Sequence, residues 1–594
     1  MVPVSDRMVS TFTWVLVGVV AYSILGMLLR TWGVLPEYVH LSGPVTTLHT
    51  KRGRRFVDWL ATPKRAWRAW GNVGVGVGLV VMVGSFFYVV LAAVLAVRDP
   101  APSAVTEPRN VLVIPGVNDF LPLSVAGEIV AGLVVALVVH EGGHALLCRV
   151  GDIEIESMGL ALLTIVPLGA FVEPNEEGVS LSDRGKQIRM YVAGVTNNFA
   201  VSLLCLALLF GPVIAGFGVV QGVHVGGTLP GTPADQAGIE SGSVITGIDG
   251  QSVANATEMQ QRLDEAGGTV EVSLQNGTVT TVDRAVVVVG AVSGAPVQTN
   301  RTIVAVNGTA VNTTTAFNEA VQDRSVARLT LDSGETVETA IGGYTVVAED
   351  GPLEAEGAPA GAAFVVTAVD GQRTATAADL VSAIGEREPG ETIRLAGYVD
   401  GQRETYEITL AEASRSDPGI GVDYVARGTS GLSVGDFGIE TYPAERFLAM
   451  LGGDVPGQQP FESTPFVQRI GLALALPFAS IVEGLSYNFP GFTGIAANFY
   501  TVSGPLSALG TDGAFLLANL LFWTGWLNLV VGQFNLVPTY PLDGGHILRV
   551  CSESIAARLP IERRERLVKA ITYGVSLTMI GSFVFIIAVP QLLG

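Results

Sequence analysis

Two histidines and a glutamate stand at a spacing typical of zinc-dependent hydrolases. The segment His140-Glu141-Gly142-Gly143-His144 closes an apolar run that begins at Val130. Residues four apart share one face of a helix, so both imidazoles can bind one metal ion while Glu141 handles a proton beside it. Ionisable residues are costly inside a membrane helix and usually mark function there. The pattern therefore predicts a zinc site rather than two structural histidines.

A third ligand is expected because catalytic zinc commonly has three protein ligands and one open position. The best candidate is Asp543, in the segment Asn535–His546 (NLVPTYPLDGGH). Its two prolines and two glycines interrupt the helix, which is tolerated at membrane depth only in a protein-lined or wet cavity. The alternative is an interfacial aspartate in a turn. The rival ligands are Glu173, Glu176, Glu177 and His546.

Composition places the chain among membrane proteins. Of 594 residues, 49% are hydrophobic and 15% are charged, and the mean hydropathy of +0.46 exceeds that of a soluble domain. The net charge is −20, and lysine occurs only at Lys51, Lys64, Lys186 and Lys569. An acidic, lysine-poor surface suits high salt, so we expect a halophilic archaeal source and no nucleic-acid binding. The cysteines are spaced neither as zinc ligands nor as a disulfide framework: Cys148, Cys205 and Cys551.

Apolar runs of spanning length predict a polytopic α-helical membrane protein with about six transmembrane helices. The runs are Thr11–Leu29, Val73–Val97, Ser124–Cys148, Ile188–Ala215, Ala514–Val537 and Val568–Val589. The first is too long for a signal peptide and is interpreted as a retained anchor. Another apolar segment, Phe466–Tyr487, is interpreted as interfacial or re-entrant, because a seventh crossing would reverse the last loop.

Positive residues set the expected orientation in the cell membrane. They cluster in Arg30–Arg68 and Arg549–Lys569, so both loops are predicted to be cytoplasmic. The N-terminus and the long middle region then lie outside, and the metal helix ends near the cytoplasmic side. Glycosylation sequons support an external middle region, since all five fall there: Asn255, Asn276, Asn300, Asn307 and Asn312.

The middle region, Gly222–Glu412, carries an internal repeat. Three segments join a short apolar strand to a turn: Ile245–Gly250, Ile303–Gly308 and Val366–Gly371. The first copy also contains Gly231–Ile245, which resembles the first part of bacterial-type PDZ domains. We expect an inserted, mainly β, extracytoplasmic region with one good PDZ-like module, a degenerate second and a remnant third. It would bind peptides or free C-termini of proteins by strand addition, or act only as a spacer.

These motifs together resemble the site-2 protease family of intramembrane zinc metalloproteases. Val166–Val172 is similar to the family's short membrane-associated β-loop, and Ala193–Phe199 to its Ala-Gly-Pro-x-x-Asn segment, with Val195 in place of the usual proline. The resemblance covers Ser124–Ala215, the PDZ-like insert and Pro490–Arg549. The first two spans are an addition to it.

The resemblance implies a metalloendopeptidase that cleaves transmembrane segments of membrane-anchored proteins, as in regulated intramembrane proteolysis. Zn²⁺ would be held by His140, His144 and Asp543 and would activate water, with Glu141 moving the proton. Asn198 would help to stabilise the oxyanion, by resemblance. The alternatives are an inactive membrane scaffold that binds transmembrane or peptide partners, and a metal transporter, which the lack of internal symmetry among the spans disfavours.

An unwound substrate segment needs a partner for its backbone hydrogen bonds. Leu160–Val172 is rich enough in β-forming residues to offer a strand edge for this segment or, alternatively, to form a buried hairpin.

The expected domain organisation has five parts: two N-terminal spans with a basic loop (8–98), the catalytic membrane segment (124–216), the PDZ-like tandem (222–412), a linker with the apolar segment (413–511) and the C-terminal membrane segment (512–594).

Overall fold

The computed structural model describes residues 4–36, 38–98, 115–116, 118, 120–164, 166–414, 417–455, 465–482, 486–560 and 563–593. The chain forms two compact units. The first, here called the helical unit, comprises Met1–Gly218, Glu445–Thr493 and Val502–Gly594, and the second, the β unit, comprises Val219–Ala444 and Gly494–Thr501.

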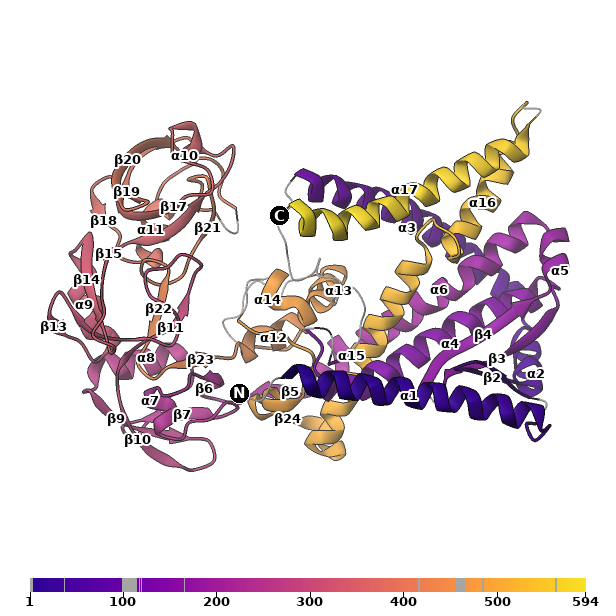
Figure 1. Cartoon of the computed structure of the whole chain (residues 1–594), viewed down its shortest axis with the longest axis horizontal. Helices are drawn as coiled ribbons and strands as arrows, with labels where there is room; N and C mark the ends of the chain where they lie inside the picture. Colours follow the sequence, from indigo (N-terminus) through magenta and orange to yellow (C-terminus); the bar gives the residue numbers. More distant parts are fainter. Residues whose placement is uncertain are drawn as a thin grey trace. The chain divides into compact units, whose positions relative to one another are not determined.

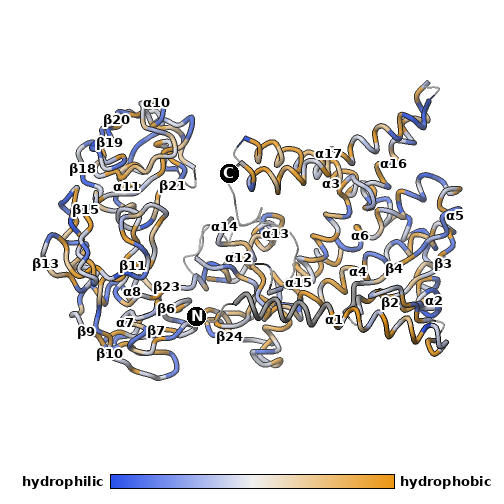
Figure 2. Tube along the Cα trace, viewed as in Figure 1, coloured by the Kyte–Doolittle hydropathy of each residue, from blue (hydrophilic) through white to orange (hydrophobic). Residues whose placement is uncertain are grey.

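Five helices of the helical unit are long and apolar enough to cross a membrane, among the residues described. They are α3 (Lys64–Arg98), α4 (Ala126–Val150), α6 (Arg184–Leu208), α15 (Gly510–Asn535) and α17 (Arg564–Leu593). Figure 2 shows their largely hydrophobic traces. Five of the six predicted spans fall on these helices. The remaining one, Thr11–Leu29, falls on α1 (Val4–Thr31), whose side chains are described only from Val17 onward.

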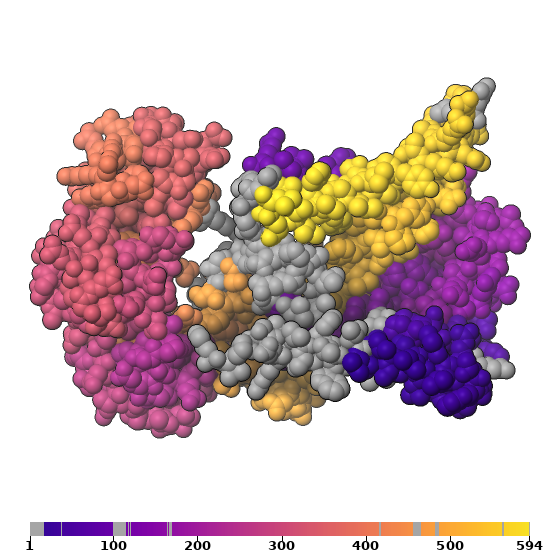
Figure 3. All heavy atoms as spheres, in the orientation of Figure 1, coloured from indigo at the N-terminus to yellow at the C-terminus, as the bar shows by residue number. Residues whose placement is uncertain are grey.

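The helices α4, α6 and α15 pack against one another, and α3 and α17 pack together beside them. Glycines allow the close approach, as in many membrane bundles. A side chain at Gly143 of α4 would place its Cβ 2.6 Å from the Ala193 carbonyl oxygen of α6. At Gly132 it would come within 3.0 Å of the Trp523 carbonyl oxygen of α15. In Figure 3, α17 (yellow) runs along the surface, where its exposed side chains include Tyr573, Leu577, Ile580 and Val584.

A four-stranded antiparallel sheet lies beside α4 in the order β1-β2-β3-β4. Its strands are β1 (Val39–Ser42), β2 (Val45–His49), β3 (Ile155–Leu163) and β4 (Val166–Pro174). The helix α2 (Lys51–Leu60) follows β2 and contacts both α4 and β3. The basic loop Arg30–Arg68 is therefore folded onto the β-loop that follows the metal helix, which the sequence does not predict.

The β unit contains three six-stranded sheets built alike (Figure 1). The first has β6 (Val223–Thr228), β7 (Val244–Ile248), β8 (Gln251–Ser252), β9 (Thr269–Leu274), β10 (Val279–Asp283) and β23 (Ile439–Thr441). The second has β11 (Val286–Ala291), β12 (Thr302–Val306), β13 (Thr309–Ala310), β14 (Val326–Leu331), β15 (Thr336–Ala340) and β22 (Leu432–Gly435). The third has β16 (Gly343–Val347), β17 (Ala363–Val369), β18 (Gln372–Arg373), β19 (Thr392–Val399), β20 (Gln402–Thr409) and β21 (Val422–Val425).

The three sheets, here called modules 1, 2 and 3, are nested in one another. The chain forms five strands of each module in turn and then returns, so that β21 pairs with β16, β22 with β11 and β23 with β6. Each module has its own apolar core and one longer helix: α8 (Ala256–Glu265), α9 (Thr314–Gln322) and α11 (Ala377–Gly385). The third module is thus a full sheet rather than a remnant, and the β region extends beyond 412 to Thr441.

A buried ion pair joins modules 1 and 2 where the outgoing and returning chains cross. Arg284 follows β10 and Asp436 precedes β23; Nη2 of the arginine lies 3.0 Å from Oδ2 of the aspartate, and the side chains are 0% and 2% exposed. Arg284 also donates to the Leu263 carbonyl at the end of α8, at 2.8 Å. Asp436 accepts from the amide and hydroxyl of Thr314 at the start of α9, at 2.8 and 2.7 Å.

The remaining elements are short. The predicted interfacial segment forms α13 (Phe466–Ala475), a 3₁₀ turn (Leu476–Phe478) and α14 (Ala479–Val482), so its described part is no continuous spanning helix. The others are α5 (Glu176–Leu181), β5 (Phe217–Val219), α7 (Pro233–Gln236), α10 (Pro352–Ala355), α12 (Ala444–Met450), β24 (Tyr500–Val502) and α16 (Asp543–Ala556). The position of 466–487 in the membrane stays a prediction.

Candidate metal centre

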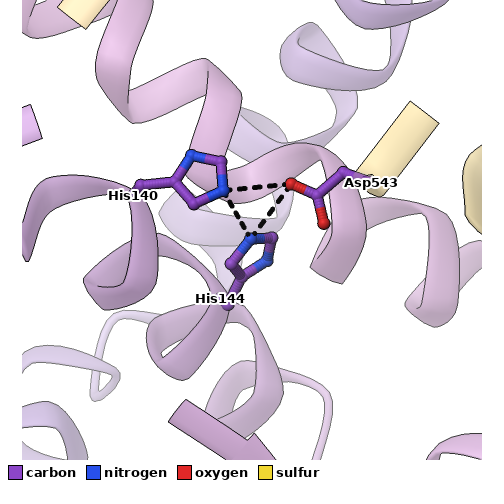
Figure 4. A group of neighbouring side chains, drawn as sticks. All are labelled: His140, His144 and Asp543. Atoms are coloured by element: carbon purple, nitrogen blue, oxygen red, sulfur yellow. Dashed lines mark hydrogen bonds and ion pairs between the residues drawn. The ribbon is translucent and has the colours of Figure 1, made fainter. Parts of the chain in front are cut away.

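The structure brings His140 and His144 of α4 together with Asp543 of α16, far away in the sequence (Figure 4). His140 Nε2 lies 3.1 Å from Asp543 Oδ2, and His144 Nε2 lies 3.2 Å from the same oxygen. The two imidazole Nε2 atoms are 3.2 Å apart. Among the residues described, these three form the one group of His, Cys, Asp or Glu side chains with this geometry.

The donor set fits zinc. Tetrahedral coordination with bonds of about 2.0–2.1 Å separates neighbouring ligand atoms by about 3.3 Å, close to the three distances observed. Asp543 Oδ2 is buried and has no hydrogen bond of good geometry to a described residue, although two nitrogens lie beside it. A nearly equilateral triangle of buried donors with such an oxygen is the arrangement expected of a metal site rather than of a hydrogen-bonded network.

The helices fix the orientation of the two histidines. His144 Nδ1 lies 2.8 Å from the Met190 carbonyl oxygen of α6, an acceptor that places the proton on Nδ1 and leaves Nε2 free to bind a metal. Both rings pack over Gly194, where an added Cβ would lie 2.7 Å from His144 Nε2 and 2.9 Å from His140 Nδ1. The glycine in Ala193–Phe199 is therefore required by the space that the imidazoles occupy.

Asp543 is the first residue of α16, directly after the loop that follows α15. The next two glycines let this helix start against that loop. A Cβ at Gly544 would lie 2.4 Å from the Val537 carbonyl oxygen, and one at Gly545 would lie 2.7 Å from the Thr539 carbonyl oxygen. A carboxyl group binds a metal in its ionised form, and an imidazole binds one in its neutral form, so Asp543 would serve as the one anionic ligand beside His140 and His144.

Glu141 lies on α4 between the two histidines, and its carboxylate accepts a hydrogen bond from the Val172 amide of β4 at 3.1 Å. This bond holds the side chain at the edge of the sheet. The outer edge of β4 is therefore partly covered by α4. Val172 donates its amide hydrogen to Glu141, and a Cβ at Gly169 would lie 2.6 Å from Leu137 of α4.

Asn198 is fully buried on α6, one helical turn after Gly194. Neither its amide nitrogen nor its amide oxygen has a hydrogen-bond partner among the described residues. Its part in stabilising the oxyanion stays a proposal.

The rival ligands do not belong to this group of three residues. Glu173 on β4 and Glu176 and Glu177 on α5 are all exposed. His546 stacks on Tyr191, with ring centroids 4.7 Å apart and ring planes 8° from parallel. Three partners of the site were missed in the sequence: the Met190 carbonyl, the Val172 amide and the packing of Gly194. Backbone groups carry no residue-type signal, so only the glycine could have been suspected.

Comparison with known proteins identifies the family of the chain. The model of Peptidase family M50 matches residues 128–579, more than half of the 594 residues. The chain therefore belongs to peptidase family M50. With the five apolar helices, this membership supports a membrane metalloprotease, the class that the motifs resemble.

The relatives are distant. A Neisseria meningitidis protein named "Putative zinc metalloprotease NMA0084" is 24% identical over 494 residues, which cover 78% of this chain and 98% of that protein. A Synechocystis protein named "Putative serine protease HhoA" is 42% identical over 48 residues, 8% of this chain and 12% of that protein. "Uncharacterized protein MJ0971" of Methanocaldococcus jannaschii is 38% identical over 48 residues, 8% of this chain and 13% of that protein. The halophilic source stays a prediction from composition.

Proposed function

We propose that this protein is an intramembrane zinc endopeptidase that cleaves transmembrane segments of membrane-anchored proteins. The observation that carries the proposal is the triangle of His140 Nε2, His144 Nε2 and Asp543 Oδ2, with sides of 3.1 to 3.2 Å. Two of its members lie on the apolar helix α4, which is long enough to span a bilayer. The family membership gives the reaction class, peptide hydrolysis.

The proposed roles follow from the chemistry of each residue. His140, His144 and Asp543 hold Zn²⁺, which supplies a Lewis acid to activate water and to stabilise the developing oxyanion. Glu141 takes the proton of the attacking water and delivers it to the leaving amide nitrogen. Its hydrogen bond to the Val172 amide fixes the carboxylate beside the sheet before substrate arrives.

The substrate must unwind before attack, because a transmembrane helix hides its carbonyl groups in its own hydrogen bonds. The sheet edge at β4 is the proposed partner for the unwound segment. For a substrate strand to pair with β4 at this point, Glu141 must release the Val172 amide. Binding of the substrate strand and the position of the Glu141 carboxylate therefore depend on the same hydrogen bond.

The β unit is proposed to be PDZ-like and extracytoplasmic and to filter substrates. Three complete modules support a binding or size-selecting role more strongly than a spacer, because each keeps its own sheet, helix and core. The proposed catalytic groups all lie in the helical unit.

The test is cleavage of a purified single-span protein in liposomes, combined with metal analysis. We expect one zinc ion per protein molecule and cleavage inside or next to the span. A chelator should abolish cleavage, and added Zn²⁺ should restore it. Zinc-loaded protein that binds single-span partners without cutting any of them would overturn the proposal and favour an inactive scaffold.

A further inference from the structure

A cavity of about 600 Å³ lies in the helical unit beside Glu141. Its walls come from α2, the start of α3, α4, the strands β3 and β4, and α6. Apart from Glu141, the polar residues that line it are Thr50 and Asn197. Such a volume lies within the range of binding sites for small organic groups.

The cavity is connected to the proposed chemistry through α4. Glu141 and Gly142 both line it, together with Ala170, Phe171 and Val172 of β4. A Cβ at Gly142 would meet no atom within 4 Å, so the helix surface next to the proposed base is open there. A peptide bond placed for attack beside Glu141 would therefore have a neighbouring side chain at the mouth of this cavity.

One wall is built by the N-terminal segment Thr50–Trp70, which precedes the region matched to the family, 128–579. Trp67 and Trp70 line the wall with their indole N–H groups already bonded, at 2.8 Å to the Leu60 carbonyl and at 2.9 Å to Asn197 Oδ1. Both rings are thus fixed and offer apolar surface to an occupant. Phe56 and Leu60 of α2 continue the wall.

We propose that this cavity receives a large apolar or aromatic side chain of the substrate, from a residue that flanks the scissile bond, and that Thr50–Trp70 thereby sets the cleavage preference. The proposal rests on the proposed function. The apolar lining rejects charged side chains, which would lose hydration without gaining a partner. A lipid tail would account for the lining, but it would not account for the position of the cavity at the proposed base.

The first test changes the size of the cavity. Ala200→Phe on α6 fills it, and Trp67→Ala enlarges it. The controls are Ala207→Phe, seven residues further along the same face of α6, and Trp59→Ala on α2; both residues are exposed and neither lines the cavity. The substrates are one single-span protein with Gly, Ala, Leu, Phe or Trp at each position flanking the cut.

For Ala200→Phe, we expect the ratio of kcat/KM for Phe over Ala at one flanking position to fall about 10-fold. Trp67→Ala should shift the preference toward Trp. The two controls should keep the wild-type ratio. Unchanged ratios in both cavity variants, or equal shifts in the controls, would overturn the proposal while leaving the proposed function intact.

The second test does not depend on turnover. Glu141→Gln protein loaded with zinc is mixed with the substrate carrying the photoreactive residue p-benzoylphenylalanine at each flanking position, then irradiated. Mass spectrometry should locate cross-links within Thr50–Trp70 from one position, and the added Ala200→Phe change should remove them. Cross-links that avoid this segment from both positions would overturn the proposal. Cross-links there, with no cleavage by the wild type, would overturn the proposed function and the link to a scissile bond, and would leave the cavity as a binding site for an apolar side chain only.

Discussion

At the scale of single residues, the side chains of the His140–His144 segment make contacts in two directions. The histidines share one face of α4 and meet Asp543, whereas Glu141 turns to the sheet and meets the Val172 amide. His144 is held from behind by the Met190 carbonyl, at 2.8 Å. The residue types alone give the candidate ligands, and the backbone groups around them fix which atoms face the centre.

Glu141→Gln should retain zinc and lose cleavage by about 10²–10⁴-fold, because the amide keeps the shape of the side chain but cannot accept the proton. Metal analysis and rate measurements on the same preparation check this. A variant that turns over at a rate comparable to the wild type would show that Glu141 is not the base.

Asp543→Ala should lower both bound zinc and activity, since one of three ligands is removed. Glu173→Ala and His546→Ala are the matched controls and should keep zinc, because neither residue belongs to the three-residue group. Zinc content per protein molecule is measured after dialysis against a weak chelator. Full occupancy in Asp543→Ala would move the third ligand elsewhere.

At the scale of elements, the metal centre depends on how closely α4 and α6 approach. Gly143 meets the Ala193 backbone, and Gly194 meets the two imidazoles, so both glycines lie at this one contact. The residue before Gly143 is also glycine, but Gly142 has open space at its Cβ position. Two neighbouring glycines with the same sequence context therefore have different structural roles.

Gly143→Ala should separate α4 from α6 and lower thermal stability by several degrees, because its Cβ would lie 2.6 Å from a backbone oxygen that cannot move alone. Zinc retention should fall with it. Gly142→Ala is the matched control and should keep both stability and zinc. The measurements are the melting temperature in detergent and the zinc content of each variant. Equal melting temperatures and zinc contents in the two variants would contradict the proposed packing role of Gly143.

At the scale of the whole molecule, the β unit has a topology that restricts how it can be cut. Its three modules are completed in reverse order by β21, β22 and β23. Removing module 3, the innermost in the chain, therefore leaves the strands of modules 1 and 2 in place. Removing the chain from β21 to β23 takes one strand from every module. The buried pair of Arg284 and Asp436 links modules 1 and 2 at the crossing. Breaking such a pair on one side is expected to cost about 3–5 kcal/mol.

Removal of residues 222–442, bridged by a flexible Gly/Ser linker, should leave cleavage of a short single-span substrate unchanged or faster, and should reduce discrimination against substrates with bulky external domains. Removal of 222–412 alone should give poorly folded protein, because β21, β22 and β23 would have no sheet to join. Loss of cleavage of the short substrate by an inserted, zinc-loaded 222–442 deletion would show that the β unit does more than filter.

Orientation in the membrane is predicted from charge and can be measured directly. In a background without Cys148, Cys205 and Cys551, a single cysteine at Glu565→Cys should be labelled by an impermeant reagent only in opened cells, and one at Gln251→Cys in intact cells. Labelling of position 565 from outside would overturn the predicted cytoplasmic location of the Arg549–Lys569 loop.

The sequence by itself determined what depends on local pattern. Apolar runs of spanning length predicted the long helices, the four-residue spacing predicted that His140 and His144 share a face, and the repeated strand and turn segments predicted the three repeats of the β unit. Asp543 was selected because its loop, rich in proline and glycine, interrupts a membrane helix, and its meeting with the histidines was a hypothesis.

The tertiary structure alone decided what depends on contacts between distant segments. The closing strands β21 to β23 are short and carry little pattern of their own, so their membership in the three modules appears only when they pair. The basic loop gave no prediction of the hairpin β1/β2 or of α2. The two strands are short, and a strand is stabilised by its neighbours more than by its own residues. The position of Asp543 follows from the packing of α16 on α6, which no local spacing encodes.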